Sequence, residues 1–324
     1  MTNRKIPVIA VAGPTASGKS ALALRLCRDY DGELISCDSM QIYKGMDIGT
    51  AKPSLSERNE IPHHLIDICE PNVDFSAASF AELASKAIAD VHARGKMPIL
   101  CGGTGLYLDS VLKGVNFGEM ESDPDYRTEL FAFAEKEGAQ ALHDRLQAID
   151  PQAAETIHPN NIKRVVRALE ICHFSGMTKT EWDQNAVKNE SPYSACILAL
   201  DYKNRENLYA RIHMRVDEMF SMGLEEEARA LLSKGYLSPE TTAGGAIGYK
   251  ELLGYIRGEM TKEEAASAIK TATRHYAKRQ LTWFRRNPDI HWLYPDDDRY
   301  EDSDQLVYAA HAIIDIHAFK SRNT

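Results

Sequence analysis

Cysteine is scarce in this 324-residue chain, and none of the six cysteines forms a C-x-x-C pair. They lie at positions 27, 37, 69, 101, 172 and 196, mostly inside apolar runs. This pattern predicts buried, reduced thiols and argues against a disulfide framework. Long apolar runs are also lacking, since none approaches the ~20 residues that span a membrane. We therefore expect a cytoplasmic protein that does not enter a membrane.

Positive charge is in deficit. The chain has 38 Lys and Arg against 47 Asp and Glu, a formal net charge of −9. Proteins that bind nucleic acid are usually basic, so this balance argues against such a partner unless basic residues gather on one face. The hydrophobic content of 44% is ordinary for a globular protein. The length allows one large domain or two smaller ones.

The strongest motif matches the pattern G-x-x-x-x-G-K-[ST]. It consists of Gly13, Pro14, Thr15, Ala16, Ser17, Gly18, Lys19 and Ser20. An apolar strand candidate precedes it and a helical pattern follows, an arrangement that aims a helix N-terminus at phosphate. In such a loop backbone amides wrap a diphosphate, the lysine reaches its outer oxygens, and the Ser20 hydroxyl can ligate Mg²⁺. The motif predicts a diphosphate site with Mg²⁺, and leaves open what is done with the diphosphate.

Short apolar segments alternate with helical patterns in the first third of the chain. The strand candidates are residues 6–12, 34–37, 65–68 and 98–101, and residues 79–93 form a helix candidate. This alternation predicts the α/β class, with a P-loop NTPase-like parallel sheet flanked by helices. Ligands of such a sheet bind outside the carboxyl ends of its strands.

Residues 121–194 interrupt this pattern. An acidic stretch opens the segment, and a helical pattern without a good strand follows, which predicts an all-helical insertion domain. The catalytic core would then comprise residues 1–120 and 195–324. In its second part we expect strands at 195–200 and 290–293 and helices at 205–222, 224–234, 249–257, 261–284 and 306–316.

Polar residues follow three of the predicted strands. Asp38 comes after residues 34–37, where a carboxylate beside the phosphate loop suits a general base, with a cap or turn role as the alternative. Thr104 follows two glycines and can cap a helix, bind substrate or do both. Asp67 ends a segment that resembles a Walker B strand, so it either holds Mg²⁺ through water or lies in a structural turn.

Basic residues gather in three places. Arg211 and Arg215 share one face of a predicted helix and suit a departing diphosphate, with salt bridges to nearby acids as the alternative. A second group is Lys163, Arg164 and Arg167, and a third is Arg274, Lys278, Arg279, Arg285 and Arg286. Such clusters either track a nucleic-acid backbone or form solvated faces.

The residues alone leave several classes open. His63 and His64 have no spacing to Asp67 and Cys69 that fits a usual zinc pattern. One class is a small-molecule or nucleoside kinase, and another is a transferase that expels diphosphate; a nucleotide switch is the third. A kinase needs a small mobile lid near mid-chain, whereas the helical insertion is large enough to grip a macromolecule.

Seven motifs resemble, in order and over nearly the whole chain, the tRNA dimethylallyltransferase (tRNA isopentenyltransferase) family. They begin at Gly13, Asp38, Met46, Pro62, Gly102, Ile247 and Tyr276, and read GPTASGKS, DSMQIY, MDIGTAKP, PHHLID, GGTGLY, IGYKE and YAKRQLTWF. The motif at residues 46–53 is especially specific, because no general phosphate-loop argument demands it. The sequence has no Cys/His zinc-finger extension and resembles the bacterial form.

The resemblance implies a reaction. The donor is dimethylallyl diphosphate, and the acceptor is N6 of adenine 37, 3′ of the anticodon, in tRNAs that read codons beginning with U. The product is N6-isopentenyladenosine. The loop at residues 13–20 would hold the donor's diphosphate rather than ATP, with Mg²⁺ at Ser20. The main alternative is an adenylate isopentenyltransferase, which prenylates free AMP or ATP and should lack a tRNA-gripping insertion.

The resemblance also implies roles by position. Asp38 matches the base that acts on N6, Thr104 the hydroxyl beside the reacting centre, and Lys19 and Arg215 the groups that stabilise the departing diphosphate. The positions that match tRNA contacts are Asp38, Ser39, Met40, Gln41, Arg127, Lys163, Arg164, Val165, Val166, Arg167, Gly245, Ala246, Ile247, Gly248, Tyr249 and Lys250. The expected partners are the tRNA anticodon stem-loop and dimethylallyl diphosphate, bound by a monomer.

Overall fold

The computed structural model describes residues 5–114, 123–186, 190–238 and 241–322. The chain forms two compact units: unit 1 comprises Met1–Leu112 and Pro192–Thr324, and unit 2 comprises Lys113–Ser191. Of the two expected boundaries of the insertion, 120/121 lies outside the described residues, and 194/195 falls inside strand β5 (Tyr193–Leu200). Unit 2 therefore ends before the strand that returns the chain to the sheet.

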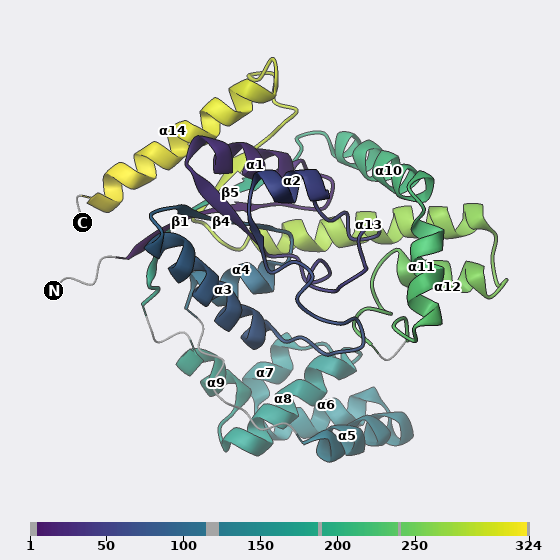
Figure 1. Ribbon diagram of the computed structural model, residues 1–324. Helices are drawn as coiled ribbons and strands as arrows, with labels where there is room; N and C mark the ends of the chain where they lie inside the picture. Colours follow the sequence, from purple (N-terminus) through teal and green to yellow (C-terminus); the bar gives the residue numbers. More distant parts are fainter. Residues whose placement is uncertain (1–4, 115–122, 187–189, 239–240, 323–324) are drawn as a thin grey trace. The chain divides into compact units, whose positions relative to one another are not determined.

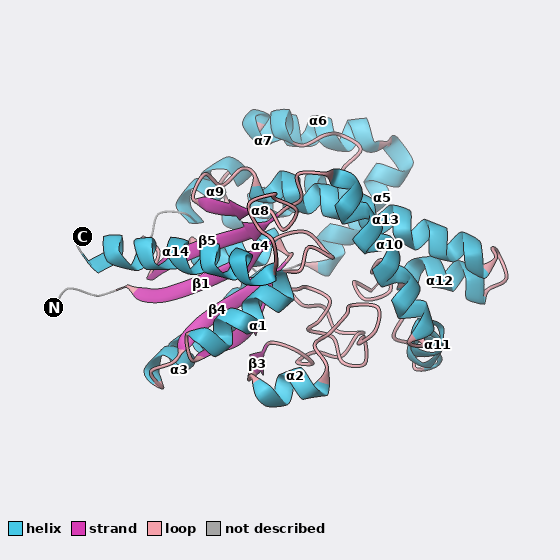
Figure 2. Cartoon of the chain, turned by 90° about the horizontal axis from the view of Figure 1, so that it is seen from above, coloured by secondary structure: helices cyan, strands magenta, loops and turns pink. Residues whose placement is uncertain are grey.

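Within the described residues, unit 1 is built on a six-stranded sheet with the order β3-β2-β4-β1-β5-β6, and the strands pair in parallel (Figures 1 and 2). The strands are β1 (Ile6–Ala12), β2 (Gly32–Ser36), β3 (His63–His64), β4 (Met97–Gly102), β5 and β6 (Ile290–Leu293). The central strands are nearly continuous apolar runs, as burial on both faces requires. The predicted α/β fold is confirmed, and the parallel pairing brings the carboxyl ends of the strands to one edge.

Helices cover both faces of this sheet. On one face, α1 (Lys19–Asp29) and α14 (Ser303–Arg322) pack Leu26 and Ala310 against the strands. On the other face lie α3 (Ala77–Ala93), α4 (Gly105–Leu112) and the end of α13 (Lys262–Phe284). Phe80, Ala84 and Ile88 are spaced by four residues, so α3 turns one buried stripe to the sheet.

A third helical layer of unit 1 follows the sequence after β5. It contains α10 (Arg205–Ser221), α11 (Leu224–Ser233) and α12 (Tyr249–Ile256), whose apolar sides share a core with residues from the segment after β2. Ile42, Tyr43 and Met46 are fully buried in this core. The chain between β2 and the short helix α2 (Leu55–Glu60) is thereby packed on α10–α12 before it reaches β3.

In its described residues, unit 2 consists of helices joined by short turns. Its helices are α5 (Pro124–Glu137), α6 (Ala139–Ile149), α7 (Pro151–Thr156), α8 (Ile162–Ser175) and α9 (Lys179–Ala186). Asp123 and Asp150 cap α5 and α7, each directly before a proline at the first helical position. Leu130, Leu142 and Val165 belong to a core of its own.

The structure departs from the expected elements at two places. The strand expected at residues 65–68 is wrong, because β3 ends at His64 and the chain then turns through Leu65 and Asp67, with φ of 63° and 57°. The C-terminal helix α14 is longer than the expected 306–316. None of the helices in the described part of the chain is long and apolar enough to cross a membrane.

Candidate active site

Unit 1 contains a cavity of about 580 Å³ at the carboxyl edge of the sheet. One wall is the glycine-rich loop between β1 and α1, and the floor includes Cys101 at the end of β4. Residues 38–41 after β2 and residues 49–53 form a second wall. The remaining sides come from α10, residues 245–248 and α13. Loops and helices that are far apart in sequence thus converge where ligands of parallel sheets bind.

The glycine-rich loop has the backbone that a phosphate cradle needs. Gly13 has φ of 142°, and a Cβ added there would lie 2.8 Å from the carbonyl oxygen of Leu200 in β5, so only glycine fits. Helix α1 begins at Lys19 without a side-chain cap, which leaves its first amides for a ligand. The Ser17 hydroxyl is buried without a hydrogen-bond partner. These features suit a bound diphosphate.

Two cations flank this loop inside the cavity. The ammonium of Lys19 lies 3.2 Å from the carbonyl oxygen of Pro14. Burial lowers the pKa of Lys19, and the nearby charge of Arg215 lowers it further, whereas Asp38 opposes this change. Burial likewise lowers the pKa of Arg215, which also lies near Asp38. The structure thus brings Lys19, Arg215 and Asp38 together, while Arg211 donates from Nε to the carbonyl oxygen of Ala16 at 2.9 Å.

The segments after β2 and β4 are linked beside the cavity. The amide of Met40 donates to Oδ1 of Asp38 at 2.9 Å, and the amide of Ser39 donates to Oγ1 of Thr104 at 3.0 Å. Thr104 does not itself line the cavity. It hydrogen-bonds to Ser39 and Tyr276, and both of these residues do line the cavity. The Thr104 hydroxyl also donates to the Ser39 hydroxyl at 3.3 Å, so it ties residues 38–40 to the chain after β4, while the carbonyl oxygen of Thr104 accepts from the amide of Leu108 in the first turn of α4.

Two residues of α13 belong to this site and were not given roles from the sequence. Burial, followed by the charge of Asp38, raises the pKa of Tyr276 to about 12, and its side chain hydrogen-bonds to Thr104 and Gln280. Gln280 accepts a hydrogen bond from the amide of Thr15 and donates one to the carbonyl oxygen of Gly103, both at 2.9 Å. Their spacing of four residues on an aromatic-rich helix was the available signal.

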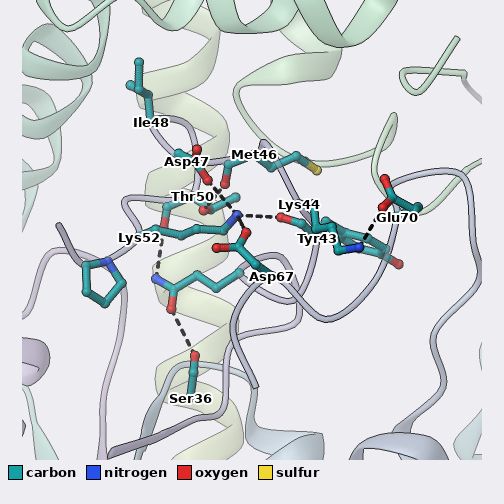
Figure 3. Close-up of polar contacts among 12 residues, drawn as sticks. Ser36, Tyr43, Lys44, Met46, Asp47, Ile48, Thr50, Lys52, Asp67 and Glu70 are labelled. Carbon is teal, nitrogen blue, oxygen red and sulfur yellow. Dashed lines mark hydrogen bonds and ion pairs between the residues drawn. The ribbon is translucent and has the colours of Figure 1, made fainter. Parts of the chain in front are cut away.

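Figure 3 shows how residues 46–53 are held beside the cavity. The ammonium of Lys52, whose side chain is 1% exposed, donates to the carbonyl oxygen of Tyr43 at 2.5 Å, to Asp47 at 2.7 Å and to Asp67 at 2.5 Å. The side-chain nitrogen Nε2 of Gln41 donates to the carbonyl oxygens of Thr50 and Ala51, both at 3.2 Å. Ser36 donates to the Gln41 side-chain oxygen at 2.9 Å. The side-chain amide of Gln41 is therefore fixed in orientation.

Asp67 is a structural residue and not a Walker B carboxylate. It lies in a turn, and its two oxygens pair with Lys52 and with Arg58, the latter at 2.6 Å. Both partners hold the pKa of Asp67 below its usual value, against the opposing effect of burial. Of the two roles that the sequence left open for Asp67, the structure favours the structural turn over Mg²⁺ binding through water.

The donor set around Ser20 fits Mg²⁺ in a limited way. Ser20 and Asp38 both line the cavity, and hydroxyl and carboxylate oxygens are ligands that Mg²⁺ accepts together with substrate phosphates and water. Among the residues that the structure describes, no group of three or more His, Cys, Asp or Glu side chains is arranged to hold a metal ion. A Mg²⁺ ion bound here would take most of its ligands from the diphosphate and from water.

The residues expected at a tRNA surface differ in their surroundings. Gly245, Ala246, Ile247 and Gly248 line the cavity, and Lys250 is exposed. Tyr249 is fully buried, and its hydroxyl donates to Glu227 at 2.7 Å, so its side chain supports the core. This is a correction to the expected surface contact, because a buried ring has no face to offer a ligand.

In unit 2, Lys163, Arg164 and Arg167 are exposed on α8, whereas Val165 and Val166 lie in the core of the unit. The expected contact by these two valines is therefore corrected, since their side chains are not accessible. Arg127 is engaged by the buried carboxylate of Glu170, with hydrogen bonds of 2.7 and 3.0 Å. All six cysteines are free thiols, and five of them are buried, as predicted.

Comparisons with known proteins agree with this architecture. The family model for IPP transferase matches residues 41–287. The tRNA dimethylallyltransferase of Halalkalibacterium halodurans is 47% identical over 289 residues, which cover 89% of this chain and 91% of that protein. The tRNA dimethylallyltransferase of Caldanaerobacter subterraneus is 43% identical over 305 residues, 94% of this chain and 96% of that protein.

Two solved structures are similar over nearly the whole chain. The full-length tRNA isopentenylpyrophosphate transferase from Bacillus halodurans has a TM-score of 0.73 and 43% identity, with 98% of this chain and 99% of that chain covered. A eukaryotic dimethylallyltransferase acting on tRNA has a TM-score of 0.80 and 32% identity, covering 94% of this chain and 78% of that chain. The fold is that of an α/β protein of the P-loop NTPase-like type. This chain belongs to the IPP transferase family.

Proposed function

We propose that this protein transfers a dimethylallyl group from dimethylallyl diphosphate to N6 of adenine 37 in tRNAs that read codons beginning with U. The observation that carries the proposal is one cavity that joins an anion cradle to a carboxylate, with Lys19 and Arg215 near Asp38. Family membership supports the reaction class, since relatives that are 47% and 43% identical to this chain are tRNA dimethylallyltransferases. The product is N6-isopentenyladenosine, and the second product is diphosphate.

The glycine-rich loop would bind the donor's diphosphate. The uncapped N-terminus of α1 and the buried Ser17 hydroxyl supply hydrogen-bond donors, and Lys19 and Arg215 supply positive charge. Both cations are half-buried, and burial strengthens the interaction of a charge with a growing negative charge compared with water. Mg²⁺, held by Ser20 and the diphosphate, would add further charge neutralisation as the leaving group departs.

Asp38 would act on the acceptor. The bond between C1 of the dimethylallyl group and the diphosphate oxygen breaks, the bond from C1 to N6 forms, and the N6 proton passes to the Asp38 carboxylate. Met40 and the Ser39–Thr104 hydrogen bond hold this segment in place. The hydroxyl of Tyr276 lies on the same side, near Asp38. Positive charge that develops at C1 of the prenyl group would be stabilised by the nearby carboxylate, more strongly where water is excluded.

The acceptor adenine must leave its stack to reach a cavity in a protein, which is easiest in the single-stranded anticodon loop. Lys163, Arg164 and Arg167 offer exposed cations on α8 for the phosphate backbone. We further propose that the protein works as a cytoplasmic monomer. The acidic net charge of −9 is compatible with this role because the cations gather locally.

One assay separates this function from its rivals. The protein is incubated with carbon-labelled dimethylallyl diphosphate and either unmodified tRNA, AMP or ATP, and a parallel reaction contains γ-phosphate-labelled ATP. We expect label in the anticodon arm of the tRNA and in none of the free nucleotides. Label in AMP or ATP would indicate an adenylate isopentenyltransferase, and transfer of the γ-phosphate to an acceptor would indicate a kinase.

A further inference from the structure

We propose that Glu227 of α11 is a positioning residue for the acceptor side of the cavity, an inference that rests on the proposed function. Its carboxylate accepts hydrogen bonds from residues 47–49 and from Tyr249 of α12. Oε2 accepts hydrogen bonds from the amides of Asp47 and Ile48 at 2.9 and 2.8 Å. Oε1 accepts from the amide of Gly49 at 3.0 Å and from the Tyr249 hydroxyl at 2.7 Å. The four donors match the roughly four lone-pair sites of an ionised carboxylate.

Three successive amides that converge on one anion form a concave backbone nest. The chain can adopt this shape because residue 49 is glycine: a Cβ there would lie 2.6 Å from Cζ of the Tyr249 ring. Charge-assisted hydrogen bonds to amides are stronger than neutral ones. Glu227 therefore fixes one end of the segment at residues 46–53, and the buried Lys52 fixes the other.

The consequence reaches the cavity through Gln41. Residues 49–53 line the cavity. The carbonyl oxygens of Thr50 and Ala51 accept hydrogen bonds from the side-chain amide of Gln41. Gln41 ends the segment that starts at Asp38, the proposed base. The glycine-rich loop is held separately, by Gln280 and Arg211. Loss of the Glu227 carboxylate should therefore disturb the wall that faces the acceptor and spare the donor site.

The test compares Glu227→Gln with Glu226→Gln in the full-length protein. Both variants remove one negative charge from the same helical turn, so the general electrostatic effect on RNA binding is matched. We expect Glu227→Gln to raise the KM for tRNA about tenfold, the worth of one charge-assisted hydrogen bond. Its KM for dimethylallyl diphosphate should stay within about twofold of the wild type, because the glycine-rich loop is held by other residues. Glu226→Gln should behave as the wild type does.

Two kinetic results would overturn the inference. One is a Glu227→Gln variant that is indistinguishable from Glu226→Gln. The other is a fall in kcat that parallels a lower melting temperature with KM for tRNA unchanged, because a merely structural residue changes the folded fraction and not the affinity. Glu227→Asp, which keeps the charge on a shorter side chain, should recover part of the lost affinity.

Hydrogen exchange tests the same residue without relying on activity. The amides of Asp47, Ile48 and Gly49 should be protected in the wild type and in Glu226→Gln, and should lose protection in Glu227→Gln. Unchanged protection in Glu227→Gln would contradict the inference. If the wild type modifies no tRNA, the proposed function fails, and the exchange result still decides whether Glu227 holds this segment.

Discussion

The backbone amide of Ser39 donates a hydrogen bond of 3.0 Å to Oγ1 of Thr104, which ties the chain after β2 to the chain after β4. Replacement of Thr104 by valine keeps the shape and removes this acceptor. We expect kcat to fall about tenfold, since an amide loses its hydrogen bond beside the proposed base. Thr104→Ser keeps the hydroxyl and should retain most of the activity. Equal activity of the valine and serine variants would show that the hydroxyl has no part in the reaction.

Asp38→Asn tests the proposed base. The asparagine oxygen can still accept the hydrogen bond from the amide of Met40, so the local turn should persist. The amide cannot take a proton from N6, and turnover should fall by about 10²–10⁴, the usual weight of a general base. Binding of tRNA, measured by filter retention or fluorescence anisotropy, should change little. Turnover close to that of the wild type would remove Asp38 from the mechanism.

The exposed cations of α8 should contribute to RNA affinity through phosphate contacts. For the double variant Lys163→Gln/Arg164→Gln, we expect weaker tRNA binding and a salt-dependence slope that is smaller by about one to two. The control is Lys136→Gln/Lys179→Gln, which removes the same charge from unit 2 at positions that already have acidic partners. A slope that is the same in both double variants would mean that α8 does not contact the RNA backbone.

Glu33 makes a pH-dependent contribution to stability. Hydrogen bonds from Arg94, together with His64, lower the pKa of this buried carboxyl from 4.5 to about 2. Because the folded pKa is depressed, the stabilisation is present above pH 4.5 and is lost as the pH falls toward 2. Glu33→Gln should therefore lower the free energy of unfolding by about 2 kcal/mol at pH 7, and by progressively less below pH ~4.

Urea unfolding from pH 7 to pH 2.5 measures this difference. Glu82→Gln serves as the control, because it removes an exposed ion pair with Lys86 on the surface of α3. A difference between the wild type and Glu33→Gln that is constant over the whole pH range would show that the ionised Glu33 does not carry the effect.

Much of the core was predictable because its signals are local. Strands β1 and β6 have the bounds that the apolar runs indicated, and helices α10 to α13 begin and end within one residue of the expected positions. The phosphate-loop motif contains its own glycines, lysine and helix start, so neighbouring residues suffice to identify it. The strand expected at residues 65–68 failed because Leu65 and Asp67 adopt positive φ, where tertiary ion pairs to Lys52 and Arg58 override an apolar run.

The supporting residues of the site were not predictable in the same way. Gln280 contacts Thr15 across 265 residues, and Glu227 contacts Asp47 across 180. The four-residue spacing of Gln280 from Tyr276 places both on one helix face, but neither it nor the identity of Glu227 tells which distant segment the side chain contacts. Likewise, the expected surface contact of Tyr249 overlooked the carboxylate of Glu227 that draws its hydroxyl into the core. The family resemblance named the segments, and only the fold shows which side chains face the cavity.

The central claim is that residues 13–20 hold a diphosphate that leaves as its carbon partner moves to an amine. The most direct measurement is a crystal structure with an unreactive thiol analogue of dimethylallyl diphosphate and Mg²⁺. We predict that the diphosphate lies against the amides of the glycine-rich loop, with Lys19 and Arg215 in contact with its oxygens and the prenyl carbon facing Asp38. An analogue bound elsewhere, with the loop free of diphosphate, would contradict the claim.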